Sequence, residues 1–331
     1  MTNNKVRKIL EKINNYQQTI NAILSLSHVL RWDNNNKNYY EDSFKFIARK
    51  MDTSNHNRIS ANNTITPDLI VQVNNNYGIV CEAKKSFPKN KDYWLKNFIQ
   101  LEKYDDDLIG WETEDERIET SDIILLTHLK LSVPVRDYIE EKISRDELKF
   151  NNNFSLIGFT RSDELDTIMM LEKRYGKLFN LELDERLRQI ERVPLKKIIP
   201  LNPIKFYDDK PELPYLMNIL WTEIFNQYPE KEDFWTSGGI KIITIIVNLK
   251  DITDKLRVQF SDYSEHDKRQ QVVPKTKWVK EAMEEFVKLG YAKKENEKNN
   301  YKIKYKSIKN PLTKFTEDIY GKKRKKITDY L

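Results

Sequence analysis

The chain has 331 residues, 39% of them hydrophobic and 33% charged, so it is long enough for two domains with a sizeable core. Its single cysteine, Cys81, excludes an internal disulfide framework and fits a reducing compartment, and its four scattered histidines show no zinc-ligand spacing. The sequence has neither an apolar segment of membrane-spanning length nor a signal-peptide core, so we expect a cytoplasmic protein with no membrane partner.

Basic residues are concentrated toward the C-terminus. Residues 271–331 hold 17 lysines and arginines against 8 acidic residues, whereas the whole chain has a net charge of only +6. The first 270 residues are therefore slightly acidic. This asymmetry is typical of a nucleic-acid binder, although a solvated lysine face would give a similar count.

Residues 4–31 are predicted to form one long amphipathic helix. Apolar residues follow heptad spacing along it: Val6, Ile9, Ile13, Tyr16, Ile20, Ile23 and Leu30. Such a helix can pack on its own chain or form the contact of a homodimer, and the sequence does not choose between the two. A polar break follows, so residues 1–36 are treated as an N-terminal segment.

A second helix is predicted from Tyr39 to about Met51, because apolar side chains recur there at helical spacing. Glu41 falls at the edge of that apolar stripe, with Asp42 beside it. An acid in a first helical turn is also common for purely structural reasons.

Residues 65–85 are predicted to form a β-hairpin. A run of β-branched residues leads to the turn sequence Asn-Asn-Asn-Tyr-Gly at 74–78, and a second apolar run follows. Glu82 and Lys84 are two apart, so they point to one face of the second strand, while Asp68 can lie across the hairpin from them.

Two carboxylates beside a lysine suit the cleavage of phosphodiester bonds. Carboxylate oxygens are the ligands that Mg²⁺ prefers, and Mg²⁺ lowers the pKa of bound water and offsets charge on a phosphate. A lysine beside the metal can orient that water or neutralise the developing charge. A surface hairpin with solvated charges is the alternative.

The pattern Pro67-Asp68…Glu82-Ala83-Lys84 resembles the PD-(D/E)xK nuclease superfamily. Gln100 and Tyr104, four apart on the helix predicted at 92–105, resemble the Q-x-x-x-Y element of its RecB-like members. This resemblance implies that Asp68 and Glu82 bind the metal and that Lys84 helps to activate water. It also implies that Gln100 and Tyr104 hold the substrate backbone or the strand that carries Lys84. It also implies a further helix acid, for which Glu41 is the first choice, and Mg²⁺ as cofactor, for which Mn²⁺ can substitute.

The rest of this domain, residues 37–193, alternates strands and helices. Residues 122–127 and 154–159 are predicted to be buried strands, 135–143 a helix, and 165–192 a long charged helix. We therefore expect an α/β fold with a mixed sheet flanked by helices, which matches the restriction-endonuclease-like fold of the resembled superfamily.

A linker with five prolines is predicted at 194–214, followed by a second domain at 215–310 and a basic tail at 311–331. Helices are predicted from Leu213, at 253–260 and at 276–289, and a basic hairpin at 291–306. This α+β order resembles a winged-helix domain. Its predicted DNA contacts are Lys275, Lys277, Lys280, Lys302 and Lys304, although winged helices also bind proteins.

The resemblances together imply a Mg²⁺-dependent DNA endonuclease, with restriction or phage defence in a prokaryote as the expected role. A TnsA-like transposition endonuclease and a non-catalytic winged-helix DNA-binding regulator are the alternatives. No P-loop motif is present, so an ATP-driven step would need a partner protein of a defence or transposition system. Cutting both strands would need a homodimer or another partner.

Overall fold

The structure is a computed structural model that describes residues 2–31, 44–47, 49–53, 64–84, 86–105, 107–162, 167–198, 204–226, 243–261, 269, 272–295 and 299–321. The chain divides into two compact units. Residues 18–208 and 262–271 form one, called here the sheet unit. Residues 1–17, 209–261 and 272–331 form the other, called here the C-terminal unit.

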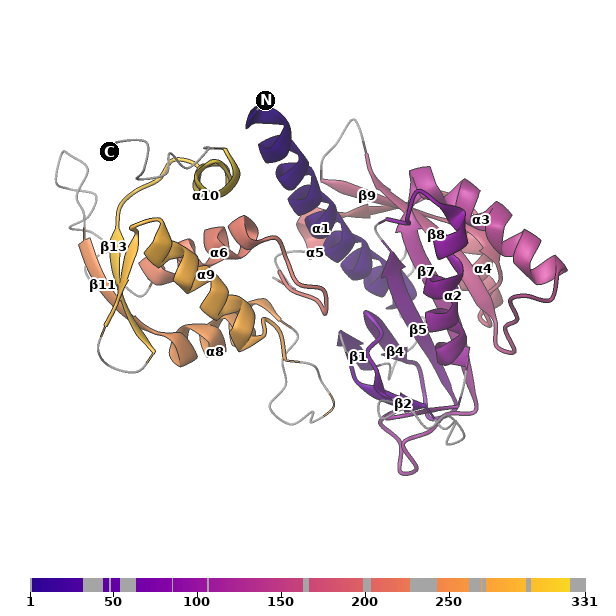
Figure 1. The fold of residues 1–331 in the computed structure, drawn as a ribbon. Helices are drawn as coiled ribbons and strands as arrows, with labels where there is room; N and C mark the ends of the chain where they lie inside the picture. Colours follow the sequence, from indigo (N-terminus) through magenta and orange to yellow (C-terminus); the bar gives the residue numbers. More distant parts are fainter. Residues whose placement is uncertain are drawn as a thin grey trace. The chain divides into compact units, whose positions relative to one another are not determined.

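A seven-stranded mixed sheet is the centre of the sheet unit (Figure 1). Its strands, in spatial order, are β1 (Phe44–Ile47), β4 (Leu69–Gln72), β5 (Tyr77–Lys84), β7 (Thr120–His128), β8 (Phe154–Arg161), β9 (Ile168–Gly176) and β10 (Glu191–Pro194). The central strands β5, β7 and β8 run parallel, and the outer pairs are antiparallel. The predicted hairpin and both predicted buried strands are therefore confirmed, and the α/β class with them.

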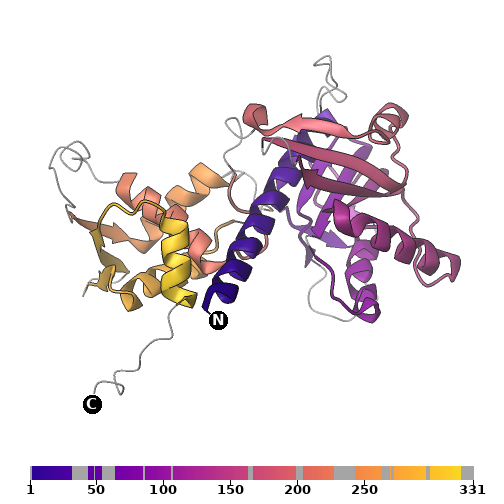
Figure 2. The same ribbon diagram turned by 90° about the horizontal axis from the view of Figure 1, so that it is seen from above.

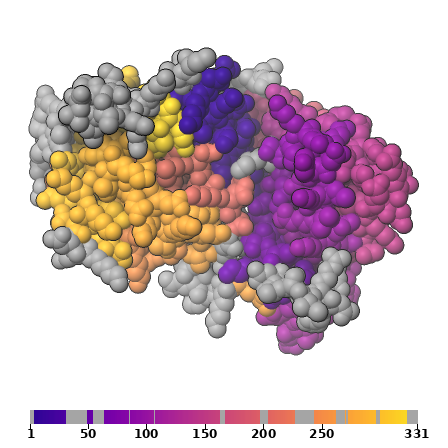
Figure 3. All heavy atoms as spheres, in the orientation of Figure 1, coloured from indigo at the N-terminus to yellow at the C-terminus, as the bar shows by residue number. Residues whose placement is uncertain are grey.

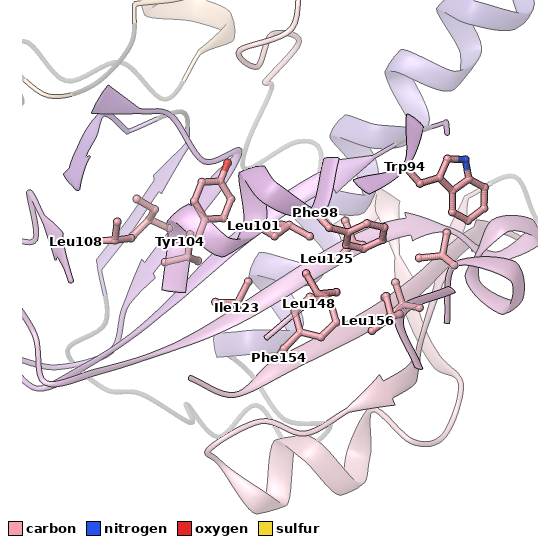
Figure 4. Packing of buried hydrophobic residues seen from close by; sticks show 14 of the residues in the cluster. Trp94, Phe98, Leu101, Tyr104, Leu108, Ile123, Leu125, Leu148, Phe154 and Leu156 are labelled. Carbon is pink, nitrogen blue, oxygen red and sulfur yellow. The ribbon is translucent and has the colours of Figure 1, made fainter. Parts of the chain in front are cut away.

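Helices α2 (Leu95–Glu102) and α3 (Leu129–Ser144) cover one face of this sheet. Short 3-10 turns at Lys91–Tyr93 and Lys103–Asp105 flank α2. Trp94, Phe98 and Leu101 form a row that packs over buried side chains of β7 and β8 (Figure 4). The predicted helices at 92–105 and 135–143 are confirmed by these elements. The same unit also contains a small three-stranded sheet beside the β4–β5 hairpin. Its strands, in spatial order, are β3 (Thr64–Ile65), β2 (Met51–Thr53) and β6 (Leu108–Ile109).

Helix α1 (Thr2–Arg31) confirms the long helix predicted at the N-terminus. Its apolar seam is buried within this chain from Val6 to Leu30, and residues 22–27 are buried on every side. Figure 2 shows the C-terminal half of α1 alongside the large sheet. Burial of the seam within this chain favours the first alternative, packing on the chain itself, over a dimer contact through this helix. The homodimer stays a prediction. Among the described residues, no helix is both long and apolar enough to cross a membrane.

The helix predicted at Tyr39–Met51 is wrong in its described part, because Phe44–Ile47 is the edge strand β1. This strand pairs with β4 in the register Phe44 with Gln72. Phe44 and Phe46 alternate with Lys45, a two-residue period that a short window does not distinguish from a helical one. Glu41 and Asp42, the expected helix acids, lie outside the described residues.

The long helix predicted at 165–192 is also wrong. The structure has strand β9, a short helix α4 (Leu181–Arg186) and strand β10 there. Met169 and Leu171 are buried on alternate positions, and β9 pairs with both β8 and β10. Gly176 ends β9 with a φ of +77°, where a Cβ would meet the Phe154 carbonyl oxygen, so only glycine fits this turn. Strand β10 and helix α5 (Leu195–Ile198) replace the start of the expected proline-rich linker.

In the C-terminal unit the elements follow the order α6 (Leu213–Asn226), β11 (Ile243–Asn248), α8 (Leu249–Phe260), α9 (Thr276–Lys288), β12 (Ala292–Lys294), β13 (Asn300–Tyr305) and α10 (Pro311–Tyr320). The strands form an antiparallel sheet in the order β11-β13-β12. Trp221 is its aromatic core, in ring contact with Phe286, Tyr305 and Phe315. Helix α10, capped by Asn310, occupies the start of the expected basic tail, and residues 322–331 lie outside the described ones.

Candidate active site

The turn between β4 and β5 fixes the register on which the site depends. The Asn74 side-chain oxygen accepts hydrogen bonds from the backbone N–H groups of Asn76 (2.8 Å) and Tyr77 (2.9 Å), which closes an Asx turn. Gly78 follows, and a Cβ there would lie 2.3 Å from the ring of Trp111. Gly78 therefore lets this ring pack directly on the backbone of β5.

The register brings Asp68 and Glu82 to the same face of the hairpin. Leu69 pairs with Cys81 and Ile70 with Val80, so Asp68, one residue before β4, falls opposite Glu82. Ile70 and Val80 both belong to the apolar cluster beneath α2. Because side chains two apart share a face, Asp68 and Glu82 also point toward α2.

Both carboxylates are almost fully buried, at 5% exposure each. Asp68 Oδ2 accepts a hydrogen bond from the Ala83 backbone N–H at 2.7 Å, which holds the start of β4 against the end of β5. Burial raises the pKa of the Cys81 thiol well above its usual value, and the charges of Asp68 and Glu82 raise it further. Cys81 is fully buried and belongs to the core.

Lys84 lies at the open end of the same face. Its ammonium donates to Glu82 Oε1 at 2.6 Å, and its side chain is 20% exposed whereas that of Glu82 is 7% exposed. The Thr127 hydroxyl donates to the Lys84 carbonyl at 3.0 Å and so ties β7 to β5 at this point. Thr127 was not selected from the sequence. Its only signal there is its place as a polar residue at the end of an apolar run.

Helix α2 and the 3-10 turn after it supply the remaining side chains. Gln100 accepts from Lys84 at 3.0 Å and donates to Glu82 Oε1 at 3.0 Å. It also lies 3.0 Å from the Tyr104 hydroxyl, which itself donates to Glu82 Oε2 at 2.5 Å. Both Glu82 oxygens are thus engaged. The residues Asp68, Glu82, Lys84, Gln100 and Tyr104, called here the carboxylate–lysine cluster, are brought together as predicted.

Tyr104 is fully buried at the edge of the apolar row of α2 (Figure 4). Burial raises the pKa of its hydroxyl well above the usual value, with Glu82 and then Asp68 raising it further. The hydroxyl is therefore protonated at neutral pH and acts as a donor to Glu82. The charge of Asp68 thus affects the pKa of Tyr104, which agrees with both acids lying on the face of the sheet that α2 covers.

His128 follows Thr127 at the same end of β7, and its described contacts are those of a helix cap. It is the N-cap of α3, where its Nδ1 accepts from the Lys130 N–H at 3.2 Å, and its ring lies edge-on to Phe159. Burial lowers the pKa of His128, and the nearby Lys130 lowers it further.

The donor set of the cluster suits a hard divalent cation. It contains two buried carboxylates and one ammonium, and carboxylate oxygens are the ligands that such a cation prefers. No group of three or more His, Cys, Asp or Glu side chains that could hold a metal ion occurs within the described ranges. Glu41, the predicted third acid, is not among the residues described.

The lysines predicted to bind DNA are all exposed in the C-terminal unit. Lys275, Lys277 and Lys280 lie at the N-terminal end of α9, where Lys275 lies 5.2 Å from the ring centre of Trp278. Lys302 and Lys304 lie on the outer face of β13, because Tyr301, Ile303 and Tyr305 point inward. The two groups occupy separate elements, and α9 lies at the surface of this unit (Figure 3).

Comparison with protein-family models, with curated proteins and with solved structures gives no match for this chain.

Proposed function

We propose that the chain is a metal-dependent DNA endonuclease whose active centre is the carboxylate–lysine cluster. The observation that carries this proposal is the pairing of Asp68 with Glu82 across β4 and β5, on one face with Lys84. Two acids and an amine at the end of a central strand are the groups that hydrolysis of a phosphodiester requires. The resemblance to the PD-(D/E)xK superfamily supports the same assignment.

Asp68 and Glu82 are the residues that would hold Mg²⁺ or Mn²⁺. A bound ion would supply positive charge against the phosphate and lower the pKa of a water molecule at neutral pH. Glu82 is oriented by three partners before any ion binds, and Asp68 is fixed by the Ala83 N–H. Both carboxylates are therefore preorganised, so that little ordering of side chains is needed on binding.

Lys84 is the catalytic cation in this proposal. Its ammonium is partly exposed whereas the acids beneath it are buried, so it is the group of the cluster that a phosphate reaches first. There it orients the attacking water and offsets the negative charge that develops on the phosphate oxygens. Gln100 and Tyr104 are positioning residues, since their side chains form hydrogen bonds with Lys84 and Glu82.

The C-terminal unit is proposed to bind the DNA. Its order of helix, strand, two helices and two strands, with β13 between β11 and β12, is similar to that of a winged-helix domain. In that arrangement α9 would enter the major groove, with Lys275, Lys277 and Lys280 on bases or backbone and Lys302 and Lys304 on phosphates. Restriction or phage defence stays the favoured role, and a TnsA-like transposition endonuclease the alternative.

The test is cleavage of supercoiled plasmid by the purified full chain in the presence of Mg²⁺ or Mn²⁺. We expect nicking or linearisation by the wild type and none by Lys84→Ala, which should still bind DNA. Lys130→Ala, which removes an exposed lysine of the same unit, serves as the matched control and should cut normally.

Equal cutting by the wild type and Lys84→Ala would reject this active centre. DNA binding by both proteins without any cutting would favour a non-catalytic winged-helix regulator instead. Mapping the ends of any product would also show whether one strand or both are cut, and therefore whether a dimer is needed.

A further inference from the structure

A pocket of about 440 Å³ in the C-terminal unit is lined by lysines from separate elements. Lys288 ends α9, Lys304 lies in β13 with Lys306 just after it, and Lys314 lies on α10. Asp318 is the one acidic residue of the lining. Among the described residues, four lysines and one acidic residue therefore line one small volume.

The charges of this lysine pocket are only partly compensated within the unit. Lys314 pairs with Asp318 at 2.7 Å, and Lys288 pairs with Glu285 at 2.8 Å. In the part of the chain that the structure describes, Lys304 and Lys306 form no ion pair with a carboxylate. Gathering uncompensated like charges around one volume opposes folding, and an anionic ligand would offset that cost.

The floor of the lysine pocket adds no further negative charge. The Tyr291 hydroxyl donates to Asp318 Oδ2 at 2.8 Å while Lys314 binds Oδ1, so both oxygens of the only lining carboxylate are engaged. The ammonium of Lys306 lies 5.5 Å from the centre of the Tyr291 ring. Within the described residues, Lys306 therefore lies against an aromatic ring and not against an acid.

The turn after α9 caps carbonyl oxygens at the end of the helix that would otherwise oppose an anion. A helix C-terminus normally presents carbonyl oxygens that repel negative charge. Here the N–H groups of Leu289, Gly290 and Tyr291 turn back to the carbonyls of Glu285, Val287 and Phe286. Gly290, with a φ of +79°, makes this reversal possible, and no atom lies within 4 Å of where its Cβ would be.

We propose that this lysine pocket binds a phosphate group. Lysine ammonium groups bind phosphate as point charges, and the volume is in the range of sites for small ligands. The phosphate belongs either to DNA, at a strand end or in the backbone, or to a small phosphorylated molecule. The inference does not depend on nuclease activity, since its residues lie outside the carboxylate–lysine cluster.

The first experiment measures the thermal unfolding midpoint of the full chain in inorganic phosphate and in chloride at equal ionic strength. Phosphate should raise the midpoint of the wild type and of Lys309→Gln, an exposed lysine that does not line the pocket. The rise should be lost in Lys306→Gln and in Lys304→Gln. Each of these variants removes a repelling charge, so both should fold.

The same rise in the wild type and in both pocket variants, or no rise in the wild type, would overturn the proposal.

A second experiment identifies the source of the phosphate. Duplexes with 5′-phosphate and 5′-hydroxyl ends are compared for binding to the wild type and to Lys306→Gln. A preference of at least about tenfold for the phosphorylated duplex, lost in Lys306→Gln, assigns the pocket to a DNA end. Equal loss of binding to both duplexes in Lys306→Gln assigns it to the backbone, and unchanged duplex binding assigns it to a small phosphorylated molecule.

Discussion

Glu82 is the residue around which the proposed active centre is built. It is 5% exposed, and its two oxygens accept hydrogen bonds from Lys84, Gln100 and Tyr104. A buried carboxylate is stable only when its oxygens have such partners, because the loss of one donor leaves the full desolvation cost of that oxygen. The surroundings of Glu82 therefore contribute to stability, and in the proposed active centre the same contacts would position Glu82 for catalysis.

Replacing Tyr104 with phenylalanine should affect both properties. The substitution removes the donor to Glu82 Oε2 and should lower the free energy of unfolding by about 1–3 kcal/mol. Plasmid cutting should slow without being abolished, because Asp68, Glu82 and Lys84 are still present. Urea unfolding and single-turnover cutting measure the two effects.

Tyr138→Phe is the matched control for this substitution. Tyr138 is buried in the same apolar layer against Trp94 and Phe98, but its hydroxyl forms no hydrogen bond in the described part of the chain. Removing the Tyr138 hydroxyl should leave plasmid cutting unchanged. If Tyr104→Phe proves as harmless as Tyr138→Phe, the positioning role of Tyr104 is wrong.

His128 gives a prediction for the pH dependence of stability. Its Nδ1 must be unprotonated to accept from the Lys130 N–H, and burial holds its pKa in the folded protein below the ordinary value of about 6.5. The unfolded chain therefore binds a proton more readily. The stability from this cap is present above about pH 6.5 and is lost as the pH falls through the lower folded pKa.

The measurement compares the wild type with His128→Asn, which keeps an N-capping side chain that does not titrate. Lowering the pH from 7.5 to 5.5 should decrease the unfolding midpoint more for the wild type than for His128→Asn. An equal decrease in the two proteins would show that His128 does not contribute to this part of the pH dependence.

At the scale of elements, local patterns predicted the hairpin that carries the site. The run of β-branched residues, the asparagine turn and Gly78 are all contiguous, so β4 and β5 need no distant information. The spacing of Gln100 and Tyr104 likewise depends only on one helix. The meeting of Asp68, Glu82 and Lys84 could therefore be predicted from the hairpin. Gln100 and Tyr104 were assigned from the resemblance, and the hydrogen bond of Thr127 could not be predicted.

The mispredicted elements are strands whose pairing partners, rather than their own local pattern, determine their structure. Strand β1 pairs with β4, and β9 pairs with β8 and β10. Charged residues such as Glu172 and Arg174 made 168–176 resemble a helix, but in the strand they form an ion pair at 2.8 Å on the less buried face. Pairing in the sheet overrides local propensity here.

Alanine substitutions in β9 test whether residues 168–176 form a strand rather than part of a helix. Leu171 is fully buried whereas Met170 is partly exposed, as alternation in a strand requires. Leu171→Ala should cost about 2–5 kcal/mol of unfolding free energy by leaving a cavity. Met170→Ala should cost clearly less. Similar losses at the two positions, measured by urea unfolding, would argue against the alternation.

At the scale of the whole molecule, catalytic and binding residues are assigned to different units. The carboxylate–lysine cluster lies within residues 68–104, whereas the predicted DNA contacts lie between residues 275 and 304. This division predicts that charge removal in the C-terminal unit weakens DNA binding without changing the chemistry of the bound complex.

The triple variant Lys275→Gln, Lys277→Gln, Lys280→Gln should bind DNA more weakly and with a smaller dependence on salt. Each lost phosphate contact decreases the slope of log K against log salt by about 0.9, so the slope should fall by up to about 2.7. The control changes three exposed lysines of the sheet unit to glutamine: Lys130, Lys149 and Lys177. A control that loses as much slope as the triple variant would contradict the division between units.

The most direct test of the central claim is whether Asp68 and Glu82 share one divalent ion. Titration of the full chain with Mn²⁺, followed by electron paramagnetic resonance, should give one site per chain in the wild type and in Asp115→Asn, an exposed acid of the same unit. Asp68→Asn and Glu82→Gln should each lose that site. Retention of the same Mn²⁺ site in either cluster variant would contradict the account.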